Sequence, residues 1–170
     1  VPYVFLTTNG SLAKSEIVKE CMGAGLDSLK WSCNVADEKQ FEQLIRTPTV
    51  FFDLVKENIK NAWEIREKNK YKTKLYASSV KYNNEQIWRM DSFLKENVLP
   101  YVDEFYWLPL YTAGGLAKEQ EKELNFKFIA GNTGRLDDPA KPLPCWTLFT
   151  EAHIMSDGRM TACCLDGAGN

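Results

Sequence analysis

The chain has 170 residues, 44% of them hydrophobic, which is enough for one domain with an apolar core. Its formal net charge of −2 supplies no basic face, so we expect no nucleic-acid partner. No stretch reaches the roughly 18 to 20 apolar residues that span a bilayer. The five unevenly spaced cysteines do not form a secreted disulfide framework, so we expect a cytoplasmic protein with no membrane partner.

The chain enters directly at an apolar run without a basic leader, so we interpret Val1 as a cut inside a longer protein. Tyr3 to Thr8 is predicted to be a strand buried on both faces. Asn9-Gly10 then predicts a turn, and Ser11 is expected to cap a helix that continues to about Gly23. Helical spacing places apolar positions of this helix on one face, at Leu12, Ile17, Val18 and Cys21.

Strands and helices continue to alternate along the chain. Further strands are predicted at residues 26–33, 74–80 and 104–110, and helices at 37–45, 49–69 and 84–98. Thr49 is expected to cap the second of these helices, whose apolar stripe is Phe52, Val55, Ile59 and Trp63. This order predicts an α/β fold with a parallel sheet and right-handed crossovers. Four strands are too few for a closed eight-stranded barrel, so the sheet is expected to be open or incomplete.

Ligands of parallel sheets bind at the carboxyl ends of the strands. Small polar residues and one tyrosine stand at those ends here. We therefore expect the chemistry to gather at four strand ends, which are residues 7–10, 32–34, 78–80 and 109–111.

The pattern changes after Tyr111. Residues 113–143 are rich in glycine and proline and predict a linker with a short helix. A second domain is expected from Pro144 onward, with strands at 146–154 and 160–163 that pair as a hairpin around the turn 156–158.

Three of the five cysteines lie around this hairpin, in the pattern Cys145-x12-Gly158-x4-Cys163-Cys164. A hairpin that carries a cysteine at each end brings two thiolates together, as a metal or cluster site needs. Two other interpretations stay open: the cysteines are simply buried, or they bind zinc together with His153. We expect Cys21 to be a core residue, and Cys33 to pack on the sheet face opposite Ser32 and Asn34.

The cysteine pattern resembles the opening of the SPASM and twitch extensions of radical S-adenosylmethionine enzymes, C-x(9–15)-G-x4-C. The upstream segments FLTTNG, DSLKWSCNVAD, KLYASSV and EFYWLPLY resemble strands three to six of the partial (βα)6 barrel that accompanies such extensions. The resemblance therefore implies a partial, TIM-like barrel in residues 1–112, a linker in 113–143 and the start of an iron–sulfur domain in 144–170.

The resemblance also implies cofactors. Cys145 and Cys163 would bind an auxiliary [4Fe-4S] cluster, with Cys164 as a further candidate. Ser32 and Asn34 would contact the ribose and the amino-acid part of S-adenosylmethionine. Thr8 would face substrate or cofactor, and Ser78, Ser79 and Tyr111 would line the same opening.

One departure from the family limits what this chain does alone. The CxxxCxxC motif that holds the catalytic cluster is absent from the sequence. The resemblance implies a parent enzyme that reductively cleaves S-adenosylmethionine to a 5′-deoxyadenosyl radical for hydrogen abstraction. A peptide or small biosynthetic intermediate would be the substrate, and flavodoxin or ferredoxin the reductant. The 170 residues alone are expected to be inactive, and to aggregate through an uncovered first strand.

A different class of function also fits the sequence: a non-catalytic α/β binding module with a zinc-stabilised cysteine hairpin. An ordinary barrel hydrolase ranks last, because no paired carboxylates or Ser–His arrangement stand at the strand ends.

Overall fold

The structure is a computed structural model that describes residues 2–45, 48–81, 84–109 and 147–161. The chain divides into two compact units, residues 1–108 and 109–170. The first unit holds strands β1 (Phe5–Thr8), β2 (Ser28–Ser32), β3 (Lys74–Lys81) and β4 (Glu104–Pro109). Its helices are α1 (Ser15–Gly23), α2 (Glu38–Gln40), α3 (Val50–Asn69) and α4 (Asn84–Asn97), with a π-helical turn at Phe41–Ile45 and a 3-10 turn at Leu99–Tyr101.

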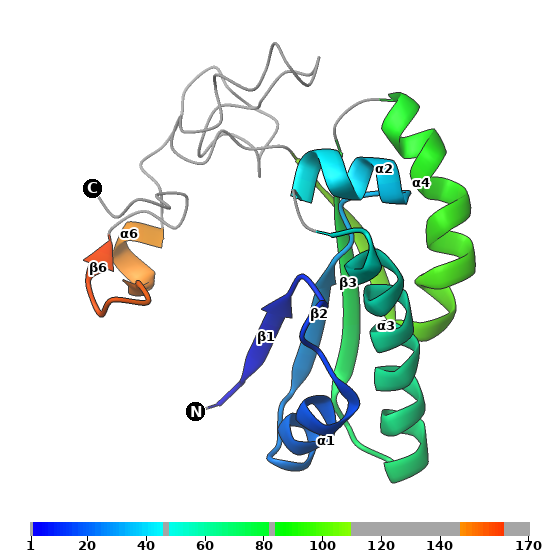
Figure 1. Cartoon of the computed structure of the whole chain (residues 1–170). Coiled ribbons are helices and arrows are strands. Elements are labelled where there is room, and N and C mark those ends of the chain that lie inside the picture. Colours follow the sequence, from blue (N-terminus) through cyan, green and yellow to red (C-terminus); the bar gives the residue numbers. More distant parts are fainter. Residues whose placement is uncertain (1, 46–47, 82–83, 110–146, 162–170) are drawn as a thin grey trace. The chain divides into compact units, whose positions relative to one another are not determined.

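The four strands form a parallel sheet in the order β1-β2-β3-β4 (Figure 1). Each strand adds to the same side of the previous one, so right-handed crossovers place the helices together on one face of the sheet. The predicted α/β fold with a parallel sheet is thus confirmed for the described residues.

The core lies between this helical face and the sheet. Side chains of alternate strand positions fill it, with Trp31, Leu75 and Ala77 fully buried. The predicted stripe of α3 is confirmed, because Phe52, Val55 and Ile59 are buried and Trp63 packs against the cluster. Met22, Met90, Leu94 and Val98 complete the same core.

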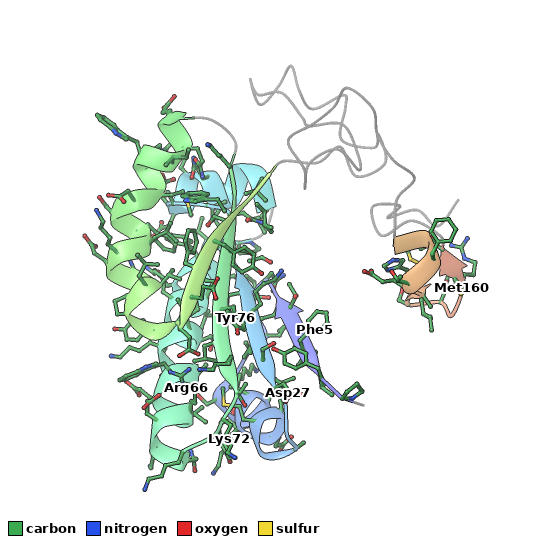
Figure 2. The ribbon with its side chains drawn as sticks, turned by 180° about the vertical axis from the view of Figure 1, so that it is seen from behind. Phe5, Asp27, Arg66, Lys72, Tyr76 and Met160 are labelled. Atoms are coloured by element: carbon green, nitrogen blue, oxygen red, sulfur yellow. The ribbon has the colours of Figure 1, made fainter. Side chains whose placement is uncertain are left out.

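The first strand is exposed, which corrects the prediction that it is buried on both faces. Phe5 is 64% exposed and Leu6 45% exposed, and Phe5 is visible on the outermost strand in Figure 2. β1 ends the strand order of the sheet, and no strand among the described residues pairs with its outer side. Within those residues, the expectation of an uncovered edge is confirmed.

Helix α1 begins at Ser15, four residues after the predicted cap. The side chain of Asn9 accepts hydrogen bonds from the backbone N–H of Ser11 (3.1 Å) and from its hydroxyl (2.9 Å). Ser11 is therefore part of an Asx turn and does not cap the helix. Leu12 therefore precedes the helix and is exposed. Within the helix Val18 and Met22 are buried, whereas Ile17 is exposed. Helix α3 was also predicted to have a side-chain cap, but Thr49 makes no such bond.

Two aspartates join neighbouring strands at the amino end of the sheet. The carboxylate of Asp27 accepts a bond from Val4 N (2.7 Å), and Asp27 N donates to Val4 O (3.0 Å). Asp103 repeats this pattern before β4: its carboxylate accepts from Leu75 N (2.8 Å), and its N–H donates to Leu75 O (2.8 Å). Each aspartate thus fixes where one strand begins relative to the previous strand.

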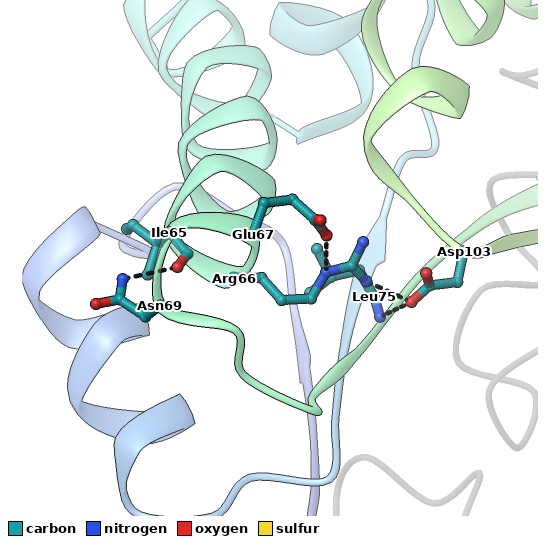
Figure 3. A network of polar contacts seen from close by, with 6 residues as sticks. All are labelled: Ile65, Arg66, Glu67, Asn69, Leu75 and Asp103. Atoms are coloured by element: carbon teal, nitrogen blue, oxygen red, sulfur yellow. Dashed lines mark hydrogen bonds and ion pairs between the residues drawn. The ribbon is translucent and has the colours of Figure 1, made fainter.

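Asp103 also ties the sheet to helix α3. Its carboxylate lies 2.6 Å from Nη1 of Arg66, whose side chain is only 12% exposed (Figure 3). The guanidinium Nε contacts Glu67 at 2.9 Å. One carboxylate therefore connects α3, β3 and the start of β4.

The second unit is described only in residues 147–161. It contains helix α6 (Thr147–Thr150) and the antiparallel pair β5 (His153–Ile154) and β6 (Met160–Thr161). The prediction of a strand over 146–154 is therefore wrong in its first part, because residues 147–150 are helical. The hairpin turn is confirmed: Gly158 has φ +84°, and its N–H donates to Met155 O at 2.9 Å.

Replacing Asp103 by alanine is expected to lower the free energy of unfolding by about 2 kcal/mol, because Leu75 N and Arg66 both lose their acceptor. Urea unfolding followed by circular dichroism measures the change. Asp91→Ala is the control, since Asp91 pairs with Lys95 on the exposed surface of α4 and should cost less than about 0.5 kcal/mol. Equal losses in the two variants would contradict the role given to Asp103.

Candidate functional site

Ser32 and Asn34 stand where β2 leaves the sheet, and both are half-buried. The backbone ladder continues for one residue beyond the strand, because Cys33 N donates to Ser78 O at 2.8 Å. The side chain of Asn34 then replaces the backbone, since its Oδ1 accepts from Val80 N at 3.1 Å. The two residues are thus fixed at the carboxyl edge of the sheet.

A pocket of about 60 Å³ lies at this edge. Its polar lining comes from Asn9, Ser11, Ser32 and Asn34, so it brings together two residues of the predicted site and two that follow β1. Its apolar lining includes the rings of Phe41, Phe52 and Phe93, which contact one another at centroid distances of 5.8 and 5.4 Å. Ligand pockets commonly measure roughly 300–1,000 Å³, so these residues form part of a wall and not a complete cofactor site.

Gly10 forms the turn that leads from β1 to the residues lining this pocket. Its φ of +86° is unfavourable for residues with a side chain. A Cβ there would lie 3.0 Å from both Trp31 and Val55, and Asn58 donates to its carbonyl at 2.8 Å. The glycine therefore sets the position of Asn9 and Ser11, which the prediction of site residues had omitted although Asn9 belongs to the TTNG segment and Ser11 directly follows it.

Ser32 and Asn34 have hydrogen-bonding groups that a ligand can use. Within the described ranges, the hydroxyl of Ser32 makes no hydrogen bond, and Asn34 uses only its side-chain oxygen and its carbonyl. The remaining hydroxyl and amide N–H groups suit the hydroxyls of a ribose or a carboxylate. The chemistry of the donor set therefore fits a nucleoside or amino-acid ligand.

The other predicted residues differ in their surroundings. The hydroxyl of Thr8 accepts from Gly10 N at 3.0 Å. Ser78 and Ser79 are buried, at 1% and 0% exposure. The hydroxyl of Ser79 donates to the carbonyl of Cys33, whereas Ser78 is paired in register with Ser32. Tyr111 lies outside the described residues.

Alternation along β3 separates the two serines. Because the paired residues of a parallel sheet project on the same side, Ser78 shares a face with Ser32, and Ser79 shares the helical face with Cys33. Thr8 is paired with the core residue Trp31 and belongs to the helical face too. The predicted residues are therefore divided between the two faces of the sheet.

Cys33 packs on the helical face, as predicted, with 5% of its surface exposed. Burial raises the pKa of its thiol from 9.0 to about 12, because the low-dielectric core disfavours the thiolate. Although Cys33 lines the pocket, it stays a neutral thiol near pH 7.

The metal residues predicted for the hairpin, Cys145, Cys163 and Cys164, lie outside the described residues. Among the residues whose structure is described, no three histidine, cysteine or acidic side chains gather as a metal site. His153 lies in β5, with its Nε2 3.5 Å from the carboxylate of Glu151. No helix in the described part of the chain is long and apolar enough to cross a membrane.

The first unit is thus a parallel α/β sheet with ligand-type polar groups at one carboxyl edge. The same fold occurs in SuiB of Streptococcus suis. The structure of SuiB bound to the precursor peptide SuiA matches 98% of this chain with a TM-score of 0.56 and 15% identity. The structure of SuiB bound to S-adenosylmethionine matches it equally well, with 18% identity.

The matched region is 44% of each SuiB chain, so this chain spans less than half the length of SuiB. No model of a protein family matches the chain, and no curated protein matches it. The likeness at this level of identity establishes the fold.

Cys33 is expected to resist alkylation by iodoacetamide at pH 8 in the folded protein and to react after unfolding, as measured by peptide mass spectrometry. The half-buried Cys21 of α1 serves as the internal comparison and should react earlier. Because the folded pKa exceeds the unfolded value of 9.0, stability from this thiol is complete below pH 9 and is lost as the pH rises toward 12. Rapid alkylation of Cys33 without unfolding would contradict the assigned burial.

Proposed function

We propose that this chain is the later part of the partial (βα)6 barrel of a radical S-adenosylmethionine enzyme, followed by the start of its SPASM or twitch extension. One observation carries the proposal: Ser32 and Asn34, the pair that the resemblance assigns to S-adenosylmethionine, meet at the carboxyl edge of a sheet that shares its fold with a protein crystallised with that cofactor. The proposed domain bounds are 1–112 for the barrel part, 113–143 for the linker and 144–170 for the extension.

In this proposal, Ser32 and Asn34 bind the ribose and amino-acid parts of S-adenosylmethionine. Ser78 is the next candidate, because it lies beside Ser32 on the same face. Thr8 and Ser79 contribute by shaping the strand ends, since their hydroxyls already bond within the protein. Tyr111 is retained as a residue that lines the opening.

Bound S-adenosylmethionine would supply the chemistry, as the source of a radical for hydrogen abstraction from the substrate. This chain's residues orient the cofactor and exclude water from one side. A catalytic cluster would be held elsewhere in the protein, because the CxxxCxxC motif is absent here. Cys145 and Cys163, with Cys164 as a third candidate, would bind an auxiliary [4Fe-4S] cluster.

A peptide or a small biosynthetic intermediate is the proposed substrate. The peptide alternative is favoured by the structure of SuiB with its precursor peptide, whose fold this chain shares. Flavodoxin or ferredoxin is the proposed reductant, and the cytoplasm the proposed location.

A zinc-stabilised, non-catalytic binding module is the second candidate. The position of His153 in the hairpin that separates Cys145 from Cys163 favours it, since imidazole and thiolate together suit zinc.

The cluster part of the proposal is tested on the full-length protein after anaerobic reconstitution. Iron and sulfide are expected in amounts for more than one cluster, and Cys145→Ala and Cys163→Ala should each lose iron equivalent to one cluster. Cys21→Ala is the control and should keep the full amount. Stoichiometric zinc with only trace iron would overturn the proposal in favour of the binding module.

The cofactor part is tested by the affinity of the same protein for S-adenosylmethionine, measured by equilibrium dialysis. Ser32→Ala and Asn34→Ala should each weaken binding about tenfold, the effect of one or two lost hydrogen bonds. The control is Ser28→Ala, which changes the same face of the same strand at its amino end. Equal affinities in all three variants would contradict the assignment.

A further inference from the structure

Two buried glutamines bracket the segment that follows β2. Gln40 of α2 is 9% exposed and Gln86 of α4 is 5% exposed, although they lie on different helices. The side-chain oxygen of Gln40 accepts from Ala36 N at 2.9 Å, and the side-chain nitrogen of Gln86 donates to Asn34 O at 3.3 Å. Between them, Nε2 of Gln40 donates to Oε1 of Gln86.

The two backbone groups at the ends of this series of hydrogen bonds fix which atom donates and which accepts in each bond. The backbone N–H of Ala36 only donates, so Gln40 must present its oxygen there and its nitrogen to Gln86. The carbonyl of Asn34 only accepts, so Gln86 must present its nitrogen there and its oxygen to Gln40. A carboxylate at either position would lack the donor that one of these contacts requires.

The ends of this bridge are themselves anchored. Asp37 caps α2 by accepting from Gln40 N at 2.9 Å, and it forms an ion pair with Arg89 of α4. Helices α2 and α4 therefore hold the segment together through one neutral contact and one charged contact. The charged pair is about 40% exposed at both side chains, so the buried amides define the geometry more strictly.

The bridge acts directly on Asn34. The side chain of this residue is fixed by Val80 of β3, and its carbonyl by Gln86 of α4. Backbone and side chain are thus held by different elements, which leaves the amide nitrogen of Asn34 in one position relative to Ser32.

We propose that Gln40 and Gln86 are positioning residues for the cofactor: their amide bridge holds Asn34 in the geometry that binds the amino-acid part of S-adenosylmethionine. This inference rests on the proposed function and adds residues that do not touch the ligand. The physical reason is that two amides buried without hydrogen bonds would be costly, whereas a bridge in which each amide oxygen and each amide nitrogen is bonded imposes one geometry on the backbone that it joins.

The test uses the full-length reconstituted protein and measures the dissociation constant of S-adenosylmethionine by equilibrium dialysis. Gln86→Glu keeps the size of the side chain and its acceptor for Gln40, but loses the donor to Asn34. It is expected to bind S-adenosylmethionine about tenfold more weakly. Gln40→Leu and Gln86→Leu should act alike, and the double variant should bind no more weakly than either single variant, because both remove the same bridge.

Thr73→Val is the matched control. Thr73 is 3% exposed and donates from its hydroxyl to Leu26 O at 2.7 Å, so the variant also loses one buried hydrogen bond, at the amino end of the sheet. It should destabilise the protein comparably, yet keep the affinity for S-adenosylmethionine within about twofold of the unmodified protein. A structural role alone would make affinity follow stability in all variants.

The outcomes separate this inference from the proposed function. If the unmodified protein binds S-adenosylmethionine and Gln86→Glu binds it equally well, the positioning role is overturned and the proposed function stands. If the unmodified protein does not bind it, the proposed function fails and the cofactor role of the glutamines fails with it. If the leucine variants do not fold, Gln86→Glu decides, because it removes only the bond to the carbonyl of Asn34.

Discussion

Asp27 directly precedes β2 and Asp103 directly precedes β4. The start of the sheet depends on one type of contact, which both aspartates make. Asp27 and Asp103 each bond both backbone groups of one residue of the neighbouring strand. A parallel pair has evenly spaced bonds, which by themselves do not specify where pairing starts. The carboxylate and the backbone N–H of one aspartate both bond the same residue of the neighbouring strand. A shift of the strand register by one residue would therefore break both bonds and turn the core-facing side chains to the other face of the sheet.

The two ends of the sheet are held by different chemistry. At the amino end, Asp103 joins Arg66 of α3, and charge contributes to the contact. At the carboxyl end, the buried contact between Gln40 and Gln86 is neutral. The amide bridge fixes the backbone around Asn34 through neutral groups, and the neighbouring ion pair of Asp37 and Arg89 is about 40% exposed, where solvent screens it. In the proposed complex with S-adenosylmethionine, the neutral bridge would neither favour nor oppose the sulfonium or the ionised amino-acid groups.

Periodic patterns in the sequence predicted most of the first unit. Alternation and helical spacing predicted the order of strands and helices along the chain and the buried stripe of α3, because those side chains pack in a regular way. The error in the start of α1 came from a local hydrogen bond that the periodic pattern does not show. Asn9 accepts a bond from Ser11, and the helix begins at Ser15. Ser32 and Asn34 were predictable as strand-end residues, because strand ends are recognisable. Gln40 and Gln86 were not, since each resembles a surface residue of its helix and their contact joins positions 46 residues apart.

The adjacent residues Ser78 and Ser79 of β3 show that two polar residues at the same strand end can have different roles. Both stand in the same polar run, and composition alone cannot separate them. The register does, because Ser78 is opposite Ser32 while Ser79 follows it on the face of Cys33, where its hydroxyl bonds the carbonyl of that residue. One serine therefore lies on the face that carries Ser32, and the next secures the backbone between Ser32 and Asn34. A polar residue at a strand end thus either faces the side that carries Ser32 or secures the neighbouring strand, and the alternation of side chains determines which.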